Sequence, residues 1–366
     1  MSTNYFFVSS PLHLLFSCNL VLGRKDDENI VVLMPRETRH FSAFEEFLAQ
    51  PPHLFDRVIS FETGILKSKF AERKRRMKII EKTLASYPAD RVFTGTDRRA
   101  EFQYAMHVAS TFNPAVTGAY VDEGMATYLG HKSMHNIAHR YIDPLAKKLV
   151  YGRWWDNPVT IGSSKWVSEV HAIYPELVHE SLTSKNVVPI DKHYFADPEF
   201  VAFCERLLRF YGVDNQSIGD VDAIIVMTHE SFYPDPDAHL RNLVQAISSN
   251  SPSSRIAIKP HPRSSEADRY RSAFSECLIL DRRASMELFM PLVKKQCVII
   301  GDISSALFTA KWFGASEHIV AVNLPHRIPG HIEDNLRHLF SKLGIVQVDV
   351  EQLPEYLAGL EQDKHS

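Results

Sequence analysis

The chain has 366 residues, of which 45% are hydrophobic and 23% are charged, a balance typical of a globular protein. This length favours two domains over one. The formal net charge of -3 gives no global basic field, so we expect no nucleic-acid partner. The sequence has no run of about 18 apolar residues, so we expect no transmembrane helix.

The cysteines show no CxxC or metal-type spacing, and we interpret them as buried free thiols. They are Cys18, Cys204, Cys277 and Cys297. Free thiols of this kind fit a reducing compartment. The apolar N-terminal segment lacks a basic leader and includes Asn4 and Pro11, so it predicts a strand, a turn and a helix rather than a signal peptide. We therefore expect a cytoplasmic protein.

Short apolar runs alternate with helical patterns in the first half of the chain. Strands are predicted over residues 4–8, 30–34, 57–61, 91–94 and 119–121, and helices from residue 11 onwards, over 67–87 and over 101–112. This alternation predicts a parallel, doubly wound sheet, because buried parallel strands are apolar on both faces. Ligands bind such sheets at the carboxyl ends of the strands, where Ser9, Asp122 and Glu123 are expected.

Three histidines follow this half at a spacing of four: His131, His135 and His139. A helix would place them on one face, which raises the question of a metal site. No carboxylate or cysteine is interleaved with them, and polar surface or acceptor contact explains them equally well. We therefore expect no metal there.

The second half repeats the pattern of the first. Strands are predicted over residues 223–227, 255–259, 277–280, 297–300 and 319–323, with a helix over 239–248. The expected fold is α/β, with two Rossmann-like domains facing a central cleft, the GT-B glycosyltransferase architecture. We place the boundary between about residues 185 and 220 and divide the chain into domains 1–190 and 191–366. The C-terminal helix is a candidate to pack back on the first domain.

Two short motifs follow strands of the second half, Lys259–Pro262 and Ser304–Ser305. Group transfer from a nucleotide-activated donor requires stabilisation of the departing phosphate. The ring N–H of His261, the serine hydroxyls and the N–H groups of a helix starting near Ser304 can provide it. Taken alone, His261 fits a histidine packed between prolines, and the serines fit a helix N-cap. Together, the two motifs favour a phosphate clamp.

An acidic pair, Asp122 and Glu123, precedes Gly124 at the end of a predicted strand. A carboxylate there can take the proton of an acceptor hydroxyl, although the same letters also fit an ordinary turn. Asp235 and Asp237 have the composition of a metal motif but lie in a proline-rich turn before a helix. We interpret them as turn and N-cap residues, so the sequence offers no metal site.

The order of these motifs resembles the bacterial two-domain, metal-independent sialyltransferases. Their pattern is a D/E-D/E-G motif in the first domain, followed by an HP motif and a Ser-Ser motif in the second. Here these are Asp122–Gly124, His261–Pro262 and Ser304–Ser305. The opening Ser9–Leu12 is also similar to the start of this family. The capsular polysialyltransferases and lipooligosaccharide sialyltransferases are the most similar group.

The resemblance implies inverting transfer of sialic acid, or a related nonulosonic acid, from a CMP-activated donor to a glycan acceptor. The product would belong to capsule or lipooligosaccharide synthesis, and no metal or other cofactor would be required. The first domain would bind the acceptor and the second the donor. Asp122 would be the general base, Glu123 would support its loop, and His261 would assist the departure of CMP. The implied donor-binding residues are Lys259, Pro262, Ser304, Ser305, Thr228 and Ser9.

A strongly cationic stretch covers residues 67–78. It fits a solvated helix face, and it also fits contact with an anionic glycan acceptor or an acidic membrane surface. The candidate acceptor-binding residues are Arg73, Arg75, Arg76, Arg98 and Arg99. Trp154 and Trp155 either line a sugar site or pack in the core. Peripheral contact with the inner membrane or with capsule export machinery stays open.

Three other interpretations of the sequence were considered. CDP-glycerol and CDP-ribitol phosphotransferases resemble the chain at Lys259–Pro262 and Asp302–Ser305, but they carry an H-G-T element that is absent here and lack the acidic motif. A CMP-Kdo or CMP-pseudaminic acid transferase is a close variant of the first reading. A non-catalytic lectin is disfavoured, because both Asp122 and His261 are present.

Overall fold

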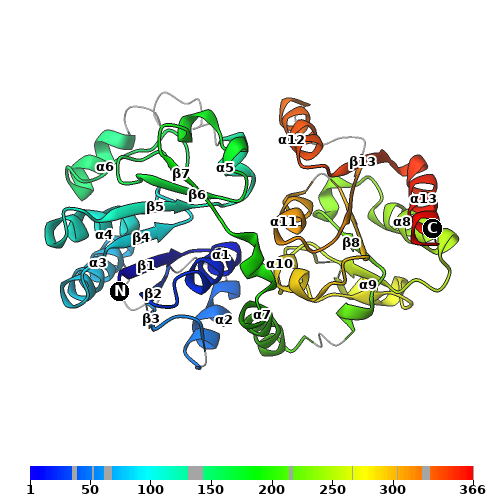
Figure 1. Cartoon of the computed structure of the whole chain (residues 1–366), viewed down its shortest axis with the longest axis horizontal. Helices are drawn as coiled ribbons and strands as arrows, with labels where there is room; N and C mark the ends of the chain where they lie inside the picture. Colours follow the sequence, from blue (N-terminus) through cyan, green and yellow to red (C-terminus); the bar gives the residue numbers. More distant parts are fainter. Residues whose placement is uncertain are drawn as a thin grey trace. The chain divides into compact units, whose positions relative to one another are not determined.

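The computed structural model describes residues 1–34, 39–51, 53–61, 68–130, 143–213, 217–265, 267–302, 304–323 and 330–365. The chain divides into two compact units, Met1–Tyr194 and Phe195–Ser366. Each unit is built on its own parallel sheet with helices on both faces (Figure 1). The α/β class with two Rossmann-like halves is therefore confirmed.

The sheet of the first unit has seven parallel strands in the order β3-β2-β1-β4-β5-β6-β7. They are β1 (Thr3–Val8), β2 (Glu28–Leu33), β3 (Arg57–Ile59), β4 (Arg91–Thr94), β5 (Thr117–Val121), β6 (Glu169–Ala172) and β7 (Asn186–Pro189). The strand order reverses between β1 and β4. This is the topological switch point where ligands bind in such sheets.

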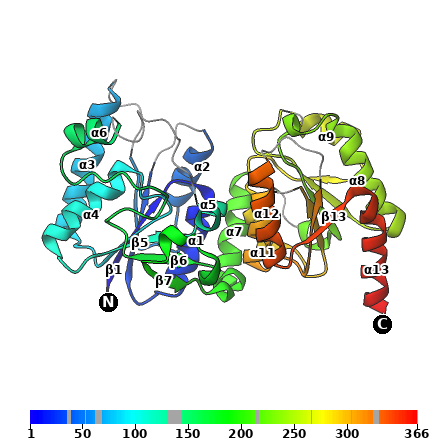
Figure 2. The ribbon, with the colours of Figure 1, turned by 90° about the horizontal axis from the view of Figure 1, so that it is seen from above.

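The helices of the first unit cover the two faces of this sheet. They are α1 (Pro11–Leu22), α2 (Arg39–Leu48), α3 (Lys69–Ser86), α4 (Ala100–Phe112), α5 (Met125–Leu129) and α6 (Asp143–Tyr151). Figure 2 shows α3 and α4 on one face and α1 on the other. Alternating strand residues explain the two layers. Tyr5 and Phe7 belong to the core beneath α3 and α4, whereas Phe6 stacks on Phe93 with ring centroids 4.7 Å apart.

The sheet of the second unit has six parallel strands in the order β10-β9-β8-β11-β12-β13. They are β8 (Ala223–Val226), β9 (Ile256–Lys259), β10 (Leu278–Ile279), β11 (Val298–Gly301), β12 (His318–Asn323) and β13 (Val346–Asp349). The order reverses between β8 and β11, so the switch point lies at the same place in the pattern as in the first unit.

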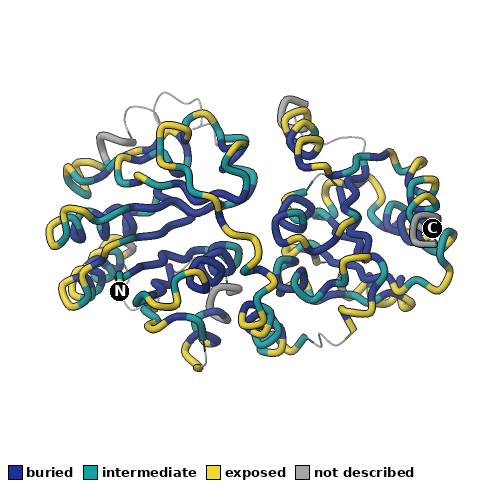
Figure 3. Tube along the Cα trace, viewed as in Figure 1, coloured by how far each residue is buried: buried dark blue, intermediate teal, exposed yellow. Residues whose placement is uncertain are grey.

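The helices of the second unit again form two layers. They are α7 (Pro198–Phe210), α8 (Pro236–Asn250), α9 (Ala267–Ala273), α10 (Met286–Phe289), α11 (Ser305–Phe313), α12 (Gly330–Lys342) and α13 (Leu353–His365). The helices α8 and α13 pack together on one face, and α10 and α11 pack together on the other (Figures 1 and 2). The strands of both sheets are largely buried (Figure 3).

Most elements predicted from the apolar runs are present, with ends that shift by a few residues. The helix predicted over residues 67–87 is α3, which begins after the N-cap Ser68. The strand predicted over residues 277–280 is reduced to β10. The four cysteines are buried and are not joined in disulfides, as predicted. Asp235 is the N-cap of α8, as expected, and accepts hydrogen bonds from two backbone N–H groups.

His131, His135 and His139 are outside the described residues. Three strands of the structure, β6, β7 and β13, were not expected from the sequence.

Candidate active site

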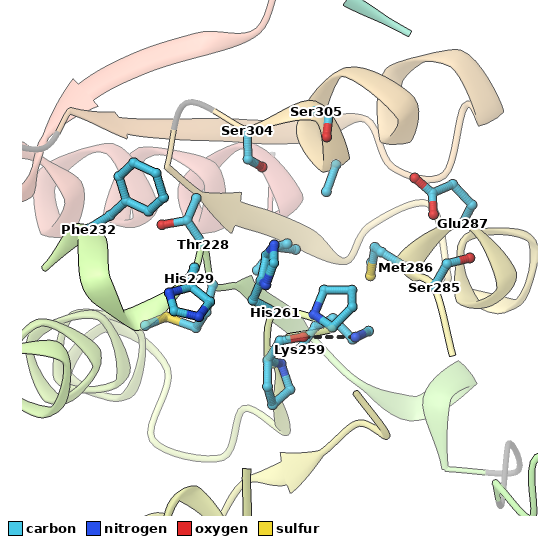
Figure 4. A pocket seen from close by; sticks show the side chains of 15 residues that line it. Thr228, His229, Phe232, Lys259, His261, Ser285, Met286, Glu287, Ser304 and Ser305 are labelled. Atoms are coloured by element: carbon cyan, nitrogen blue, oxygen red, sulfur yellow. Dashed lines mark hydrogen bonds between the residues drawn. The ribbon is translucent and has the colours of Figure 1, made fainter. Parts of the chain in front are cut away.

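A cavity of about 330 Å³ opens at the carboxyl ends of β8, β9 and β11 in the second unit (Figure 4). Its lining combines the residues that follow these strands with the start of α10 and of α11. It is lined by Val226, Met227, Thr228, His229, Phe232, Lys259, Pro260, His261, Pro262, Ser285, Met286, Glu287, Ser304, Ser305 and Ala306. The structure therefore brings together the HP and Ser-Ser motifs, which are far apart in sequence.

His261 stands in this cavity between two prolines and beside His229 (Figure 4). The two imidazole rings meet edge to face, with centroids 5.4 Å apart. The His261 Nδ1 accepts a hydrogen bond of 3.1 Å from the backbone N–H of Arg263, which leaves Nε2 as the proton-bearing nitrogen of the neutral ring. Burial, followed by the charge of Arg263, lowers the pKa of His261. At neutral pH the ring is thus an uncharged hydrogen-bond donor.

Ser304 and Ser305 form the start of α11. Ser304 occupies the N-cap position, but its side chain makes no capping hydrogen bond. Its Oγ is buried and has no hydrogen-bond partner among the described residues. Buried hydroxyls are nearly always paired, so one left open beside a cavity at a helix N-terminus is a place for an anionic ligand.

Lys259 lies beneath the HP motif at the end of β9. Its side chain is buried, and Nζ donates a hydrogen bond of 2.9 Å to the carbonyl oxygen of Pro260 (Figure 4). Burial lowers the pKa of Lys259 to about 8, while Glu287 and Asp281 act in the opposite direction. The lysine therefore holds the loop that carries His261 and adds positive charge close to the cavity.

A buried polar network supports the same edge of the sheet. Thr228, after β8, donates a hydrogen bond of 2.8 Å from Oγ1 to Asp302 Oδ2, after β11. The hydroxyl of Tyr233 donates to the same carboxylate oxygen. His239 Nε2 lies 3.6 Å from the other oxygen, Oδ1. Thr228 thus lines the cavity and is also tied into this network. The sequence analysis missed Tyr233 and His239, the other members of the network.

Glu287 is a second residue that the sequence analysis missed. Among the described residues that line the cavity it is the only carboxylate, and it lies in the first turn of α10. Its Oε1 accepts a hydrogen bond of 3.1 Å from Thr309 Oγ1. The sequence signal for Glu287 was an acidic residue in the first turn of a helix. Acidic residues are common at that position, so the signal does not distinguish a binding residue.

In the first unit, Asp122 follows β5 and is fully buried. Its Oδ1 accepts hydrogen bonds from the Gly124 N–H at 3.1 Å and from Thr127 Oγ1 at 2.8 Å. Its Oδ2 accepts from the Tyr128 hydroxyl and from the Ile173 N–H at 3.3 Å. Burial raises the pKa of Asp122 to about 6 against the effect of these bonds. Asp122 is therefore the anchor of the turn that Gly124 completes at a φ of 94°.

Glu123 lies at the same turn but in a different environment. Its side chain is 19% exposed, and Oε1 lies 3.2 Å from Nε2 of the buried His13, although not in hydrogen-bond geometry. Its other oxygen, Oε2, is buried and has no hydrogen-bond partner among the described residues. Glu123 therefore has one carboxylate oxygen without a hydrogen-bond partner among the described residues, whereas both oxygens of Asp122 accept hydrogen bonds.

Ser9 and His13 complete this cluster at the switch point of the first sheet. Ser9, after β1, has its Oγ 3.1 Å from His13 Nδ1. Gly95, after β4, leaves room for the imidazole, because a Cβ there would lie 1.9 Å from His13 Nε2. The ends of β1, β4 and β5 thus converge on Glu123. The structure places Ser9 in this cluster in the first unit, and His13 is a further residue that the sequence analysis missed.

The candidate acceptor-binding arginines have different surroundings. Arg75 Nη2 lies 2.6 Å from Glu72 Oε1, and Arg76 contacts both Glu72 and Glu101 at 3.5 Å. Arg73 donates a hydrogen bond to the hydroxyl of Tyr151. Two more follow β4: Arg98 donates to the Val159 carbonyl oxygen at 3.3 Å, and Arg99 occupies the N-cap position of α4.

The described residues offer neither a cluster of metal ligands nor a membrane-spanning helix. They contain no group of three or more His, Cys, Asp or Glu side chains arranged to hold a metal ion. Asp237, a candidate considered above, pairs with Arg269. Within the described part of the chain, no helix combines the length and the apolar character needed to cross a membrane.

Comparison with solved structures identifies the architecture. An alpha/beta-galactoside alpha-2,3-sialyltransferase from Photobacterium phosphoreum is 11% identical, with 96% of this chain and 100% of that chain covered at a TM-score of 0.57. The GT-B domain of a Photobacterium damselae sialyltransferase is 14% identical, with 95% and 100% covered at 0.56. A UDP-GlcNAc 2-epimerase from Methanocaldococcus jannaschii is 14% identical, with 98% and 92% covered at 0.53. At these identities the similarity shows the GT-B fold.

Comparison with protein families shows the family of the chain. A search of curated proteins finds no match. The model of the alpha-2,8-polysialyltransferase family matches residues 4–322, in agreement with the resemblance drawn from the sequence motifs. Because this match spans most of the chain, the chain belongs to the alpha-2,8-polysialyltransferase family and is a glycosyltransferase that transfers sialic acid.

Proposed function

We propose that the chain is an inverting, metal-independent transferase that moves sialic acid, or a related nonulosonic acid, from a CMP-activated donor. As a sialyltransferase, it uses a nucleotide-sugar donor and a glycan acceptor. One observation carries the proposal: the unpartnered hydroxyl of Ser304, the ring of His261 and the start of α11 meet at one cavity in the second unit. We assign the donor to this second unit and the acceptor to the first.

The donor phosphate would lie at the N-terminus of α11. There the backbone N–H groups and the helix dipole favour an anion, and the hydroxyls of Ser304 and Ser305 add donors. His261 would donate from Nε2 to the same phosphate. Glu287 is suited to the ribose hydroxyls, since an acidic residue is the usual partner of a ribose diol in Rossmann-like folds. Pro262 would help to hold the ring of His261.

The reaction would be a direct displacement at the anomeric carbon. The acceptor oxygen forms the new bond to that carbon while the bond to the phosphate oxygen breaks, and CMP leaves with the electron pair. Charge that develops on the departing phosphate is stabilised by Ser304, His261 and the helix N-terminus. Attack from the opposite side inverts the anomeric centre. The acceptor hydroxyl loses its proton to a carboxylate of the first unit.

We assign this base to Glu123. The sequence analysis gave the role to Asp122 and a supporting role to Glu123, but the surroundings of the two side chains favour the reverse. Asp122 is fully buried and accepts hydrogen bonds from four donors, whereas Glu123 Oε2 has no partner among the described residues. His13, held by Ser9, would orient Glu123.

The acceptor is proposed to be an anionic glycan. The cationic residues of α3 support this, and Arg73, Arg98 and Arg99 remain candidates for contact with it. Arg75 and Arg76 are weaker candidates, since carboxylates of the same unit already neutralise them. A role in capsule or lipooligosaccharide synthesis, a cytoplasmic location and a peripheral contact with the inner membrane or export machinery belong to the same proposal.

A donor screen tests the proposal. CMP-sialic acid, CMP-Kdo, CDP-glycerol and CDP-ribitol are each incubated with the protein, with and without a sialylated oligosaccharide, and nucleotide release is measured. We expect CMP release from CMP-sialic acid that depends on the acceptor and persists in EDTA. Release only from a CDP-polyol would assign the chain to polyol-phosphate transfer, and turnover that requires a divalent ion would contradict the metal-independent mechanism.

A further inference from the structure

A second cavity, of about 330 Å³, lies in the first unit among α3, α4 and α6. We call it the α3 pocket. Aromatic rings from Phe70, Tyr104, Tyr151 and Trp154 form much of its wall. Neither Glu123 nor any residue in contact with it lines this pocket, so the α3 pocket is separate from the proposed transfer centre.

The rings of the α3 pocket pack against one another. Trp154 meets Tyr104 with centroids 5.5 Å apart at 61°, and Tyr151 with centroids 5.8 Å apart at 45°. The Nε1 of Trp166 donates a hydrogen bond of 2.9 Å to the backbone oxygen of Trp154. Phe70, at the rim, is 45% exposed. The pocket therefore presents fixed aromatic faces, whose negative potential favours the C–H bonds of a pyranose ring.

The same wall carries excess positive charge. Arg73, Lys74 and Lys78 contribute three cations and Glu81 one carboxylate, a net charge of 3 - 1 = +2. Lys74 Nζ lies 4.8 Å from the centroid of the Phe70 ring. Within the described residues, neither Lys74 nor Lys78 has an ion pair. These two ammonium groups are therefore available to an anionic group beside the rings.

The cations on the rest of α3 behave differently. Arg75 is paired with Glu72 at 2.6 Å, and Arg76 is paired with Glu101 at 3.5 Å. The helix thus neutralises these two arginines with carboxylates of its own unit and leaves lysines uncompensated where the aromatic rings are.

We propose that the α3 pocket binds a carboxylate-bearing sugar unit of an extended glycan, away from the transfer centre. This inference rests on the proposed function only in taking the acceptor to be an anionic glycan. A neutral sugar would pack against the aromatic rings but would not pair with the lysine ammonium groups. A flat, anionic membrane surface would satisfy the lysines, but it would not fill a ring-lined cavity. Bound units of a long acceptor would hold it on the enzyme between successive transfers.

The test is a binding titration without donor. The variant K74S/K78S is compared with the control K82S/K342S, which removes two exposed lysines outside the pocket and gives the same change in net charge. The probes are a long α2,8-linked sialic acid oligomer, the corresponding dimer and a neutral glucose oligomer. We expect K74S/K78S to bind the long oligomer about tenfold more weakly, a typical effect of losing two exposed charge contacts. The control should bind it like the wild type, and the glucose oligomer should bind weakly throughout.

Equal affinity of K74S/K78S and wild type for the long oligomer would overturn the inference. If the variant then also bound more weakly to vesicles that contain anionic phospholipid, the two lysines would be a membrane contact. Because the titration contains no donor, failure of CMP-dependent transfer leaves its result intact and the two proposals stay distinguishable.

Discussion

At the end of β5 in the first unit, Asp122 accepts hydrogen bonds from four donors, and the Nδ1 of His13 lies 3.1 Å from Ser9 Oγ. At the end of β11 in the second unit, the buried hydroxyl of Ser304 has no partner among the described residues, and it borders an open cavity. Both clusters occupy the switch point of a parallel sheet. In the first cluster Asp122 is bonded within the protein and one oxygen of Glu123 has no hydrogen-bond partner among the described residues, whereas the second cluster leaves a hydroxyl donor without one.

The contrast matches what each half of a transfer reaction requires. A base must be held at a fixed place and keep one oxygen available, so most of its surroundings are internally bonded. A phosphate site must supply donors that only the ligand satisfies. Four expected outcomes test this contrast, from the largest effect to the smallest.

Glu123→Gln should lower the rate of transfer by about 10²–10⁴-fold, the usual effect of removing a general base. The amide keeps the size of the side chain but cannot accept the proton. CMP affinity should not change, because Glu123 lies in the first unit and the proposed donor site lies in the second. Turnover and CMP calorimetry measure the two quantities. Near-normal turnover would return the role of base to Asp122 or to another group.

Asp122→Ala should act mainly on stability. The four buried donors would lose their partner at about 1–3 kcal/mol each. The variant also removes the desolvation cost of the buried carboxylate, so we expect a net loss of roughly 2–4 kcal/mol in the free energy of unfolding. Chemical denaturation measures it. A variant as stable as the wild type but inactive would show that Asp122 is the base rather than the anchor of the turn.

The pH dependence of stability should show the raised pKa of Asp122. The folded-state pKa is about 6, above the usual value of 3.8, so its contribution to stability is present below about pH 4 and lost as the pH rises through 6. The shift corresponds to roughly 3 kcal/mol. Asp122→Asn should lack this component when the two proteins are unfolded between pH 4 and 7. Parallel stability curves would refute it.

Ser304→Ala should weaken CMP binding by about tenfold, because a hydrogen bond to a charged group contributes about 1.5–3 kcal/mol. The melting temperature should stay the same, since the hydroxyl has no hydrogen-bond partner among the described residues. Ser231→Ala, whose hydroxyl is bonded to His229, is a control outside the cavity lining. A melting temperature lowered in Ser304→Ala with unchanged CMP affinity would make Ser304 a structural cap.

The sequence predicted the elements whose signal is local. Apolar runs such as Ala223–Val226 produced correct strands, because buried parallel strands are apolar throughout. The strand β6, Glu169–Ala172, gave no such signal, since it contains a glutamate and a histidine. In the structure His171 is buried and its Nε2 lies 3.2 Å from Glu169 Oε2, a pairing that periodicity does not reveal.

The candidate site was predictable in part for the same reason. Asp122, Glu123, His261 and Ser304 directly follow strands, so their position at the sheet edge could be inferred. Whether Asp122 or Glu123 faces the core could not be inferred, because successive residues at a strand end point in opposite directions. The bonds that fix the roles come from distant positions.

The long-range network of the second unit shows the same limit. The bond between Thr228 and Asp302 joins residues 74 positions apart. Tyr233 and His239 become recognisable as its members only once β8 and β11 lie side by side.

A crystal structure with CMP bound tests the central claim most directly. The account predicts that the phosphate lies within hydrogen-bond distance of Ser304 Oγ, His261 Nε2 and the first backbone N–H groups of α11, with no metal ion between them. A phosphate that lies elsewhere, or one that reaches the protein only through a divalent ion, would contradict it.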